Sequence, residues 1–411
     1  MARPSNETES AATLVADRTG QDAAAPAPQG KVTAGRATVL PRVGPPSAGL
    51  AVRLVHEERL RYEPVRHLGA GGMGEVDLAH DNDIDRPIAV KRLLPEAADA
   101  AALARFVDEI RTIGKLEHPN IVPVHDVGMD EQGRYYFVMK YVEGETLESI
   151  IDKLDQGDPE YQARYSFERR VEIFTGLLHA LQLAHDRGIV HRDVKPANVM
   201  VGRYGEVVLM DWGIAKTLGA AEGPTEAEAV PAARAGRMST TQVGTLVGTP
   251  AYMAPEQAAG ANALVDRRSD LYSACVLLHE LMTLRHYLEG HESVETMLQA
   301  IIGEPFGFAR LVQLSDHPPR PAPPVEFLHF VAKGLSKKPG QRFQSAAEMI
   351  AALGGMLAGQ VRVQCHATLA KRAARELGRF VDRHPHLGFA SFVAGLALLG
   401  FGAWSALAAL L

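Results

Sequence analysis

The stretch that most constrains the fold of this chain runs from residue 190 to residue 213. Within it, Asp193, Lys195, Asn198 and Asp211 place two carboxylates, an amine and an amide in one short segment. Two apolar runs, 199–201 and 207–210, flank a Gly-Arg-Tyr-Gly sequence whose glycines favour a tight hairpin turn. Such a turn folds the chain back on itself, so that Asp211 is expected to lie near Asn198.

This pairing predicts a site for phosphate chemistry. A carboxylate and an amide oxygen that converge on one point suit a hard cation such as Mg²⁺. Asp193 then remains as a candidate base or proton acceptor. Taken alone, Asp193 could be a turn residue and Asp211 a helix cap, but their spacing to Lys195 and Asn198 favours the site.

Length and composition indicate a globular protein of two or three units. The 411 residues are 46% hydrophobic and 22% charged, which is enough apolar material for a sizeable core. The net charge of −6 gives no reason to expect nucleic acid as a partner. The two cysteines, Cys275 and Cys365, cannot form a disulfide framework and indicate a reducing compartment. The N-terminal residues show no secretory signal.

The pattern along the chain predicts an α+β fold with a strand-rich lobe followed by a helical lobe. Residues 1–60, rich in Ala, Pro, Gly, Ser and Thr, are expected to form a disordered arm, more simply an inert linker than a functional one. Four or five strands and one helix are expected in an N-lobe at 61–141, and mainly helices in a C-lobe at 142–357. The expected helices cover 97–115, 166–187, 270–284, 325–335 and 345–357.

The C-terminal segment differs in kind from the rest. Residues 358–386 hold six Lys or Arg against two acids, and no charged residue follows Arg383. Residues 387–411 would extend about 37 Å as a helix, more than the roughly 30 Å of a hydrocarbon core. A buried soluble helix is the alternative to a transmembrane span. The basic flank predicts a single-pass C-terminal anchor in the cell (inner) membrane, with the folded part cytoplasmic and no outer domain.

A glycine-rich segment precedes the expected second strand. Gly69-x-Gly71-x-x-Gly74 followed by Val76 also fits a dinucleotide-binding turn, but that turn opens a helix. Here residues 75–78 alternate like a strand. We therefore expect a hairpin whose backbone N–H groups cover phosphates.

Lys91 ends an apolar strand, where an unpaired ammonium would be costly to bury. Glu109, beside the apolar face of the following helix, is the expected partner. A solvent-exposed strand end is the alternative for Lys91 considered alone.

These motifs, taken together and in order, resemble bacterial members of the eukaryotic-like (Hanks-type) serine/threonine protein kinases over about residues 61–357. The motifs are the glycine loop 69–76, Ala89-Val90-Lys91, Glu109, His191-Arg192-Asp193 with Asn198, Asp211-Trp212-Gly213, Ala254-Pro255-Glu256 and Asp270.

The resemblance implies a role for each residue. Lys91 would hold the α- and β-phosphates of ATP and pair with Glu109, Asp193 would accept the proton of the substrate hydroxyl, and Lys195 would neutralise the moving phosphoryl group. Asn198 and Asp211 would hold Mg²⁺, with Mn²⁺ as an alternative. The implied ATP-binding residues are Leu68, Gly69, Ala70, Gly71, Gly72, Met73, Gly74, Val76, Ala89, Lys91, Met139, Tyr141 and Val142. The implied structural residues are His191, Arg192, Glu256 paired with Arg342, and Asp270.

The chain departs from the family pattern in two places. Trp212 replaces the usual Phe, which changes the packing behind the metal site, and Lys140 stands where the hinge often has an acid. The long segment 213–254 is rich in Ser and Thr, and Arg192 suggests that a phosphate there orders it. The favoured acceptors are Thr240, Thr241 and Thr245, and an unmodified solvated loop is the alternative.

The expected function is transfer of the ATP γ-phosphoryl group to protein Ser or Thr in membrane-associated signalling, with protein substrates, membrane lipid and a transient homodimer as partners. A scaffold that binds ATP without catalysis is the first rival, and the intact set of catalytic residues disfavours it. The second rival is a small-molecule phosphotransferase. The Ala254-Pro255-Glu256 segment disfavours that one, because in the family it serves peptide binding.

Overall fold

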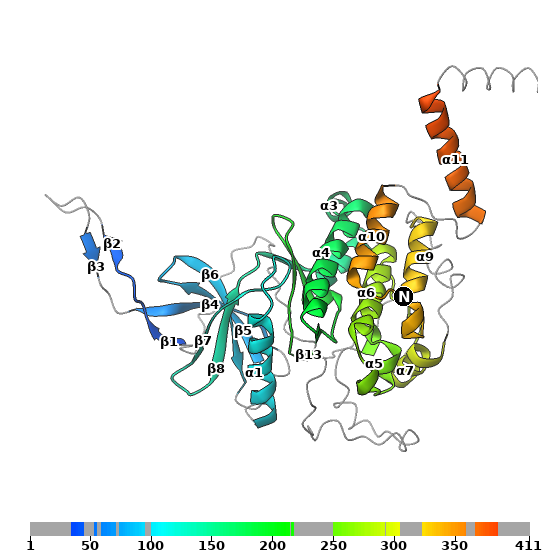
Figure 1. Ribbon diagram of the computed structural model, residues 1–411. Helices are drawn as coiled ribbons and strands as arrows, with labels where there is room; N and C mark the ends of the chain where they lie inside the picture. Colours follow the sequence, from blue (N-terminus) through cyan, green and yellow to red (C-terminus); the bar gives the residue numbers. More distant parts are fainter. Residues whose placement is uncertain are drawn as a thin grey trace, which may run out of the picture.

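A computed structural model of the chain describes residues 34–44, 53–55, 59–70, 74–94, 100–213, 215–217, 250–291, 293–304, 323–358 and 366–384. Its strands and helices separate into a strand-rich part and a helical part, as Figure 1 shows. The N-terminal part is drawn in blue and cyan, and the helical part in green to orange. The expected order of a strand-rich lobe and a helical lobe is confirmed.

The strand-rich part is built on one sheet of six strands in the order β1-β4-β5-β6-β8-β7. All neighbouring strands in it are antiparallel. Helix α1 (Ala100–Gly114) belongs to this part (Figure 1). The strands are β1 (Ala34–Ala37), β4 (Leu60–Ala70), β5 (Gly74–Asp81), β6 (Arg86–Leu93), β7 (Val124–Met129) and β8 (Tyr135–Lys140).

The sixth strand, β1, was not expected. Its residues pair with β4, with Ala34 opposite Tyr62 and Ala37 opposite Leu60. A separate hairpin pairs β2 (Arg42–Gly44) with β3 (Arg53–Val55). The expectation of disorder throughout residues 1–60 was therefore wrong for these three strands, whose hydrogen bonds come from pairing that local composition does not reveal. Residues 1–33 lie outside the described part of the chain.

The helical part packs around α4 (Phe167–Asp186) and α6 (Arg267–Thr283). Ser166 caps the start of α4 by accepting a hydrogen bond from the Arg169 N–H, and Gly188 follows its end at a φ of 71°. Nearly every side chain of α6 is buried. The other helices are α2 (Leu147–Asp155), α3 (Pro159–Arg164), α5 (Pro255–Ala258), α7 (Val294–Gly303), α9 (Val325–Gly334), α10 (Ala346–Leu357) and α11 (His366–Arg383), with 3₁₀ turns η2 (Pro196–Asn198), η6 (Pro250–Tyr252), η7 (Asn262–Leu264) and η8 (Pro339–Gln341).

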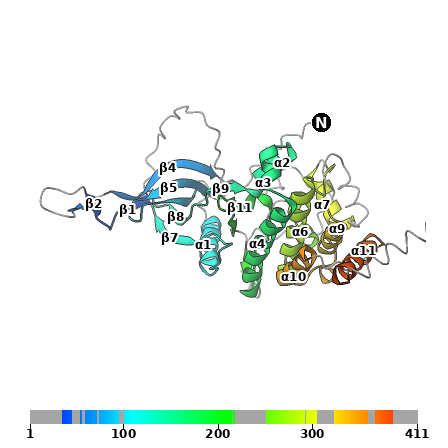
Figure 2. The same ribbon diagram turned by 90° about the horizontal axis from the view of Figure 1, so that it is seen from above.

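Short strands join the two parts. Strand β11 (Val199–Gly202) pairs with β12 (Val207–Leu209) on one side and with β9 (Gly144–Thr146) on the other. Strand β10 (Ile189–Val190) pairs with β13 (Lys216–Thr217). Seen from above in Figure 2, β9 and β11 lie between the six-stranded sheet and α4. One continuous core of buried side chains includes Val76, Phe106 and Met139 of the strand-rich part and Phe174 and Leu277 of the helical part.

The segment expected to be a basic stretch before the membrane contains a helix. Helix α11 occupies 366–383 and projects from the helical part near α9 (Figure 1). Among the described helices, none combines the length and the apolar character that a membrane crossing requires. The expected span at 387–411 lies outside the described residues.

Candidate active site

The hairpin β11–β12 places the proposed metal ligands side by side. Val199 stands opposite Leu209, and Gly205 at the turn has a φ of 89°, which favours glycine. Beyond the paired strands, the Met210 N–H donates to the Asn198 carbonyl at 2.9 Å. The hairpin expected from the glycine spacing is confirmed, and it brings Asp211 beside Asn198.

The catalytic candidates lie on the loop between β10 and η2. The Lys195 ammonium is 2.9 Å from the Asp193 carboxylate. The Asn198 amide nitrogen donates to the Asp193 main-chain oxygen at 2.8 Å and to its carboxylate at 3.1 Å. Lys195 and Asn198 are buried. The loop therefore holds the Asp193 carboxylate in place between a cation and an amide donor.

Asp270 of α6 holds this loop in place through hydrogen bonds to its backbone. Its carboxylate accepts from the main-chain N–H groups of His191 at 2.9 Å and Arg192 at 2.8 Å, and lies 2.8 Å from the His185 ring. Burial alone would raise the pKa of Asp270, but His185, His191 and the backbone donors lower it below its ordinary value. The ionised carboxylate supports Arg192, whose φ of 71° is unusual for a residue with a side chain.

His191 occupies a packed position. Its side chain is fully buried, its Nε2 donates to the Met210 carbonyl at 3.1 Å, and its Nδ1 accepts from the Asp193 N–H at 3.2 Å. The ring packs edge-on against Trp212, with 4.5 Å between centroids. These contacts use both ring nitrogens, which is the arrangement of a structural histidine and leaves neither nitrogen for the reaction.

The donor set at Asn198 and Asp211 fits a hard divalent cation. The two hydrogen bonds from the Asn198 side chain to Asp193 use the amide nitrogen, so the amide oxygen is the atom suited to a cation. Burial would raise the pKa of Asp211, but Lys91, Lys195 and His191 hold it below its ordinary value. Two protein oxygens completed by phosphate oxygens and water are typical of Mg²⁺. No group of three His, Cys, Asp or Glu ligands occurs within the described ranges.

Lys91 lies opposite these groups, on β6. Its ammonium donates to Glu109 of α1 at 2.6 Å and lies 3.7 Å from Asp211. Burial would lower the pKa of Lys91, but the carboxylates of Glu109 and Asp211 outweigh it and raise the pKa to about 12. Lys91 is therefore cationic at neutral pH, and one ion cluster joins the sheet, α1 and the metal-ligand segment.

The apolar residues expected around adenine belong to the same core. Ala89 of β6 stands opposite Met139 of β8, and Val76 of β5 is buried beside them. Gly69 and Ala70 end β4, and Gly74 begins β5, where a side chain would come within 2.5 Å of the Arg92 carbonyl oxygen. The remaining members described are the buried Leu68 and Val142 and the half-buried Tyr141. Gly71, Gly72 and Met73 lie outside the described residues.

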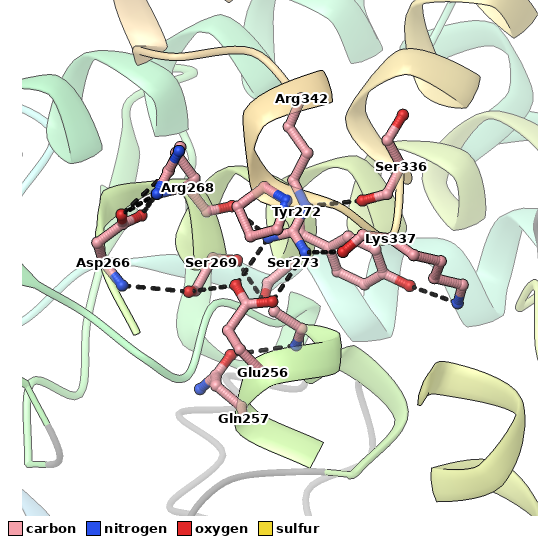
Figure 3. Close-up of polar contacts among 12 residues, drawn as sticks. Glu256, Gln257, Asp266, Arg268, Ser269, Tyr272, Ser273, Ser336, Lys337 and Arg342 are labelled. Atoms are coloured by element: carbon pink, nitrogen blue, oxygen red, sulfur yellow. Dashed lines mark hydrogen bonds and ion pairs between the residues drawn. The ribbon is translucent and has the colours of Figure 1, made fainter. Parts of the chain in front are cut away.

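Glu256 and Arg342 form a buried, bidentate ion pair. Arg342 donates from Nη1 to Oε1 at 2.7 Å and from Nη2 to Oε2 at 2.8 Å, and Ser269 donates to Oε1 at 2.6 Å (Figure 3). The guanidinium also lies 4.9 Å from the Tyr272 ring centroid. Burial would raise the pKa of Glu256, but Arg342 and Ser269 lower it below its ordinary value. The pair joins α5 to the segment before α10.

Two residues that hold the site together were not predicted from the sequence. His185 of α4 contacts Asp270, as described above, and Gln257 of α5 donates to the Arg192 carbonyl at 2.9 Å while accepting from the Ala254 N–H at 3.1 Å. Gln257 thus ties the Ala-Pro-Glu segment to the catalytic loop. Its position directly after Glu256 was the only available signal. The expected phosphorylation sites Thr240, Thr241 and Thr245 lie outside the described residues.

Comparison with known proteins decides the family. The protein kinase domain matches residues 62–352, well over half of the chain. The chain belongs to the protein kinase family. The match begins within β4 and ends within α10, so this kinase domain contains every residue of the site described above.

The curated relatives are bacterial serine/threonine-protein kinases. A probable serine/threonine-protein kinase of Streptomyces coelicolor is 38% identical over 329 residues, which cover 79% of this chain and 44% of the relative. A probable serine/threonine-protein kinase of Corynebacterium efficiens is 38% identical over a region that covers 71% of this chain and 41% of the relative. The serine/threonine-protein kinase PknD of Protochlamydia amoebophila is 33% identical over a region that covers 75% of this chain and 31% of the relative. The chain spans less than half the length of these relatives. The resemblance to bacterial serine/threonine protein kinases is confirmed.

Proposed function

We propose that this kinase transfers the γ-phosphoryl group of ATP to Ser or Thr hydroxyls of protein substrates. The observation that carries the proposal is the Asp193 carboxylate held by Lys195 at 2.9 Å and by Asn198 at 3.1 Å, on a loop anchored to α6. A carboxylate so held suits a base that receives one proton from an acceptor hydroxyl.

In the proposed reaction, Asp193 takes the proton of the substrate hydroxyl as its oxygen bonds to the γ-phosphorus. The bond between that phosphorus and the bridging oxygen breaks, and ADP leaves with the electron pair. Lys195 neutralises negative charge on the moving group, and Lys91, cationic through Glu109 and Asp211, would hold the other phosphates. Mg²⁺, or Mn²⁺ in its place, would be held by Asn198 and Asp211 and would supply positive charge to the phosphate oxygens.

The adenine would rest on the buried apolar residues of both lobes. We propose Leu68, Val76, Ala89, Met139 and Val142 as its neighbours, with the backbone around Tyr141 as the hydrogen-bonding hinge. Gly69 to Gly74 would cover the phosphates. At Gly74 an added Cβ would lie 2.5 Å from the Arg92 carbonyl oxygen, so the start of β5 requires glycine.

The activation segment would be phosphorylated by the kinase itself, on Thr240, Thr241 and Thr245. Support comes from the sequence: Arg192 stands beside Asp193, and a guanidinium suits binding of a phosphate carried by the Ser- and Thr-rich segment 213–254. Phosphorylation between two copies would use a transient homodimer.

We propose further that the charge-free residues after Arg383 anchor the chain in the cell membrane, with the kinase domain cytoplasmic. Support comes from sequence alone: 25 largely apolar residues at 387–411 follow a basic stretch. Anchored chains would meet more often, which favours phosphorylation in trans and a role in membrane-associated signalling.

The test is incubation of the full chain with Mg²⁺ and labelled ATP beside two variants. Asp193→Asn removes the base, and a triple Thr240→Ala, Thr241→Ala, Thr245→Ala variant removes the proposed acceptors. We expect label on 240–245 in the parent and at least about 100-fold less in Asp193→Asn. The triple variant should lose this label and show reduced, but not abolished, activity toward a generic protein substrate. Bound ATP without label on the parent or on any added protein would instead favour a scaffold.

A further inference from the structure

Helix α11 presents an apolar stripe to the solvent. It projects from the helical part, in contact with α9 (Figure 1). Leu369, Leu377 and Val381 are 53%, 65% and 40% exposed, which is unusual for large apolar side chains on one helix. A soluble helix that carries such a stripe needs something to cover it.

The stripe follows the helical repeat. Leu369, Ala373, Leu377 and Val381 stand four residues apart, and Ala370 and Ala374 lie beside them, so these positions fall within about 140° of the helix circumference. The charged residues Lys371, Arg372, Glu376, Arg379, Asp382 and Arg383 occupy the remainder. The helix is thus divided into one apolar and one charged face.

The charged face, and not the apolar face, contacts the kinase domain. Thr368 is fully buried, and the Lys371 ammonium lies 2.9 Å from Glu326 of α9. Helical spacing places both residues roughly opposite the Leu377 stripe. The contact with α9 therefore turns the stripe away from the domain.

The charge of α11 indicates what kind of partner covers its apolar stripe. Helix α11 carries five Lys or Arg and two Asp or Glu, so its net charge is 5 − 2 = +3. A second copy laid on the stripe would bring the same positive charge against it. An anionic lipid surface would take the stripe into its headgroup region and attract Arg372 and Arg383, which lie beside the Leu369 edge of the stripe.

We infer that α11 lies in the plane of an anionic bilayer surface with its Leu369–Val381 stripe inserted, and that it thereby orients the kinase domain relative to the membrane. The inference rests on the membrane anchoring proposed above, because the charge-free run begins at His384, one residue after α11 ends. The contact between Lys371 and Glu326 would pass this orientation to the helical lobe.

The test uses the full chain in a Cys365→Ser background, since the other cysteine, Cys275, is buried. An environment-sensitive fluorophore is attached at Leu377→Cys, on the stripe, or at the matched Asp382→Cys, on the charged face. The chain is reconstituted in vesicles of phosphatidylcholine alone or with one third phosphatidylglycerol. Flotation of the vesicles reports the anchor, and quenching by lipid-borne quenchers reports α11.

With the anionic vesicles we expect several-fold more lipid quenching at position 377 than at 382, and a smaller difference with neutral vesicles. Adding Val381→Glu should reduce the quenching at 377. A chain that floats while 377 and 382 respond alike overturns the inference and leaves the anchor standing. A chain that does not float overturns both. Shielding of 377 in detergent, at the mass of two chains, assigns the stripe to a second copy and also overturns the inference.

Discussion

At the scale of single residues, the buried ionisable groups fall into two kinds. Asp270 and Glu256 are buried with partners of opposite charge or with donors that hold them ionised, and the partly buried Lys91 is paired with Glu109. His279 of α6 is fully buried, and burial lowers its pKa to about 4, with the Arg285 backbone opposing. The first kind serves the site, whereas His279 lies within the helical core as a neutral ring.

The low pKa of His279 predicts a pH-dependent stability. The ordinary pKa of 6.5 applies to His279 in the unfolded chain. Between pH 6.5 and about pH 4 the unfolded state therefore binds a proton at this ring and the folded state does not. The contribution is present above pH 6.5 and is lost as the pH falls toward 4. From about pH 7.5 to about pH 5.5 it should cost about 1.4 kcal/mol of unfolding free energy.

Replacing His279 by Leu should remove this slope. Urea unfolding of parent and variant at both pH values measures it, and the difference between the two proteins isolates the histidine from the carboxyl groups that also titrate. A variant that keeps the slope of the parent would show that the ring does not carry it.

At the scale of elements, the ion pair between Glu256 and Arg342 joins parts of the chain 86 residues apart. Both side chains are buried, so that removing one charge strands the other. Arg342→Met should therefore reduce the unfolding free energy by about 3–5 kcal/mol in urea. The matched control is Arg285→Met, which breaks the exposed pair with Glu289 at 3.5 Å and should cost less than about 1 kcal/mol.

A double variant separates the stranded charge from lost packing. Glu256→Gln combined with Arg342→Met should regain part of the loss. Equal costs for Arg342→Met and Arg285→Met would mean that the pair does not stabilise the lobe.

The elements also show what the sequence could predict. Helix α4 was readable because Val171, Phe174 and Leu178 repeat at helical spacing and Ser166 caps its start. The hairpin that places Asp211 was readable from two apolar runs around glycines. The proposed catalytic and metal-ligand residues lie close together because one loop and the adjoining hairpin, both local in sequence, carry them.

Contacts between distant segments were not readable. Strand β1 gains its hydrogen bonds from β4, and its own residues carry no apolar alternation. The role of Gln257 depends on the Arg192 carbonyl, 65 residues earlier, and that of His185 on Asp270, 85 residues later. Trp212 was recognised as unusual, yet only the structure places it on the His191 ring.

At the scale of the whole molecule, one ion cluster links the two lobes. Lys91 and Glu109 belong to the strand-rich lobe and Asp211 to the segment that follows β12. A nucleotide with its metal would contact Lys91 of the strand-rich lobe and Asp211 of the helical lobe, and would thereby stabilise the folded chain. At a hundredfold excess over its dissociation constant, MgATP should add about 2.7 kcal/mol to the unfolding free energy.

Removal of the metal should separate the stabilisation due to Mg²⁺ from the stabilisation due to the nucleotide. Chelation of Mg²⁺ is expected to reduce this stabilisation, and Asp211→Asn should abolish the part that depends on the metal. Asp186→Asn, at an exposed helix end, is the control and should respond as the parent does. Thermal unfolding with and without ligand gives the comparison, and an unchanged metal dependence in Asp211→Asn would exclude Asp211 as a ligand.

The carboxylate of Asp270 has a consequence for how the protein is made. That carboxylate accepts the main-chain N–H groups of His191 and Arg192, which precede it by 79 and 78 residues, so the ribosome synthesises the loop with the proposed catalytic residues before α6. A nascent chain whose α6 has not yet left the ribosome contains Asp193 and Lys195 but lacks the Asp270 carboxylate that holds their loop in place. We expect such a chain to be inert toward ATP, so that the enzyme stays silent during its own synthesis and begins to work only once the helical lobe is complete.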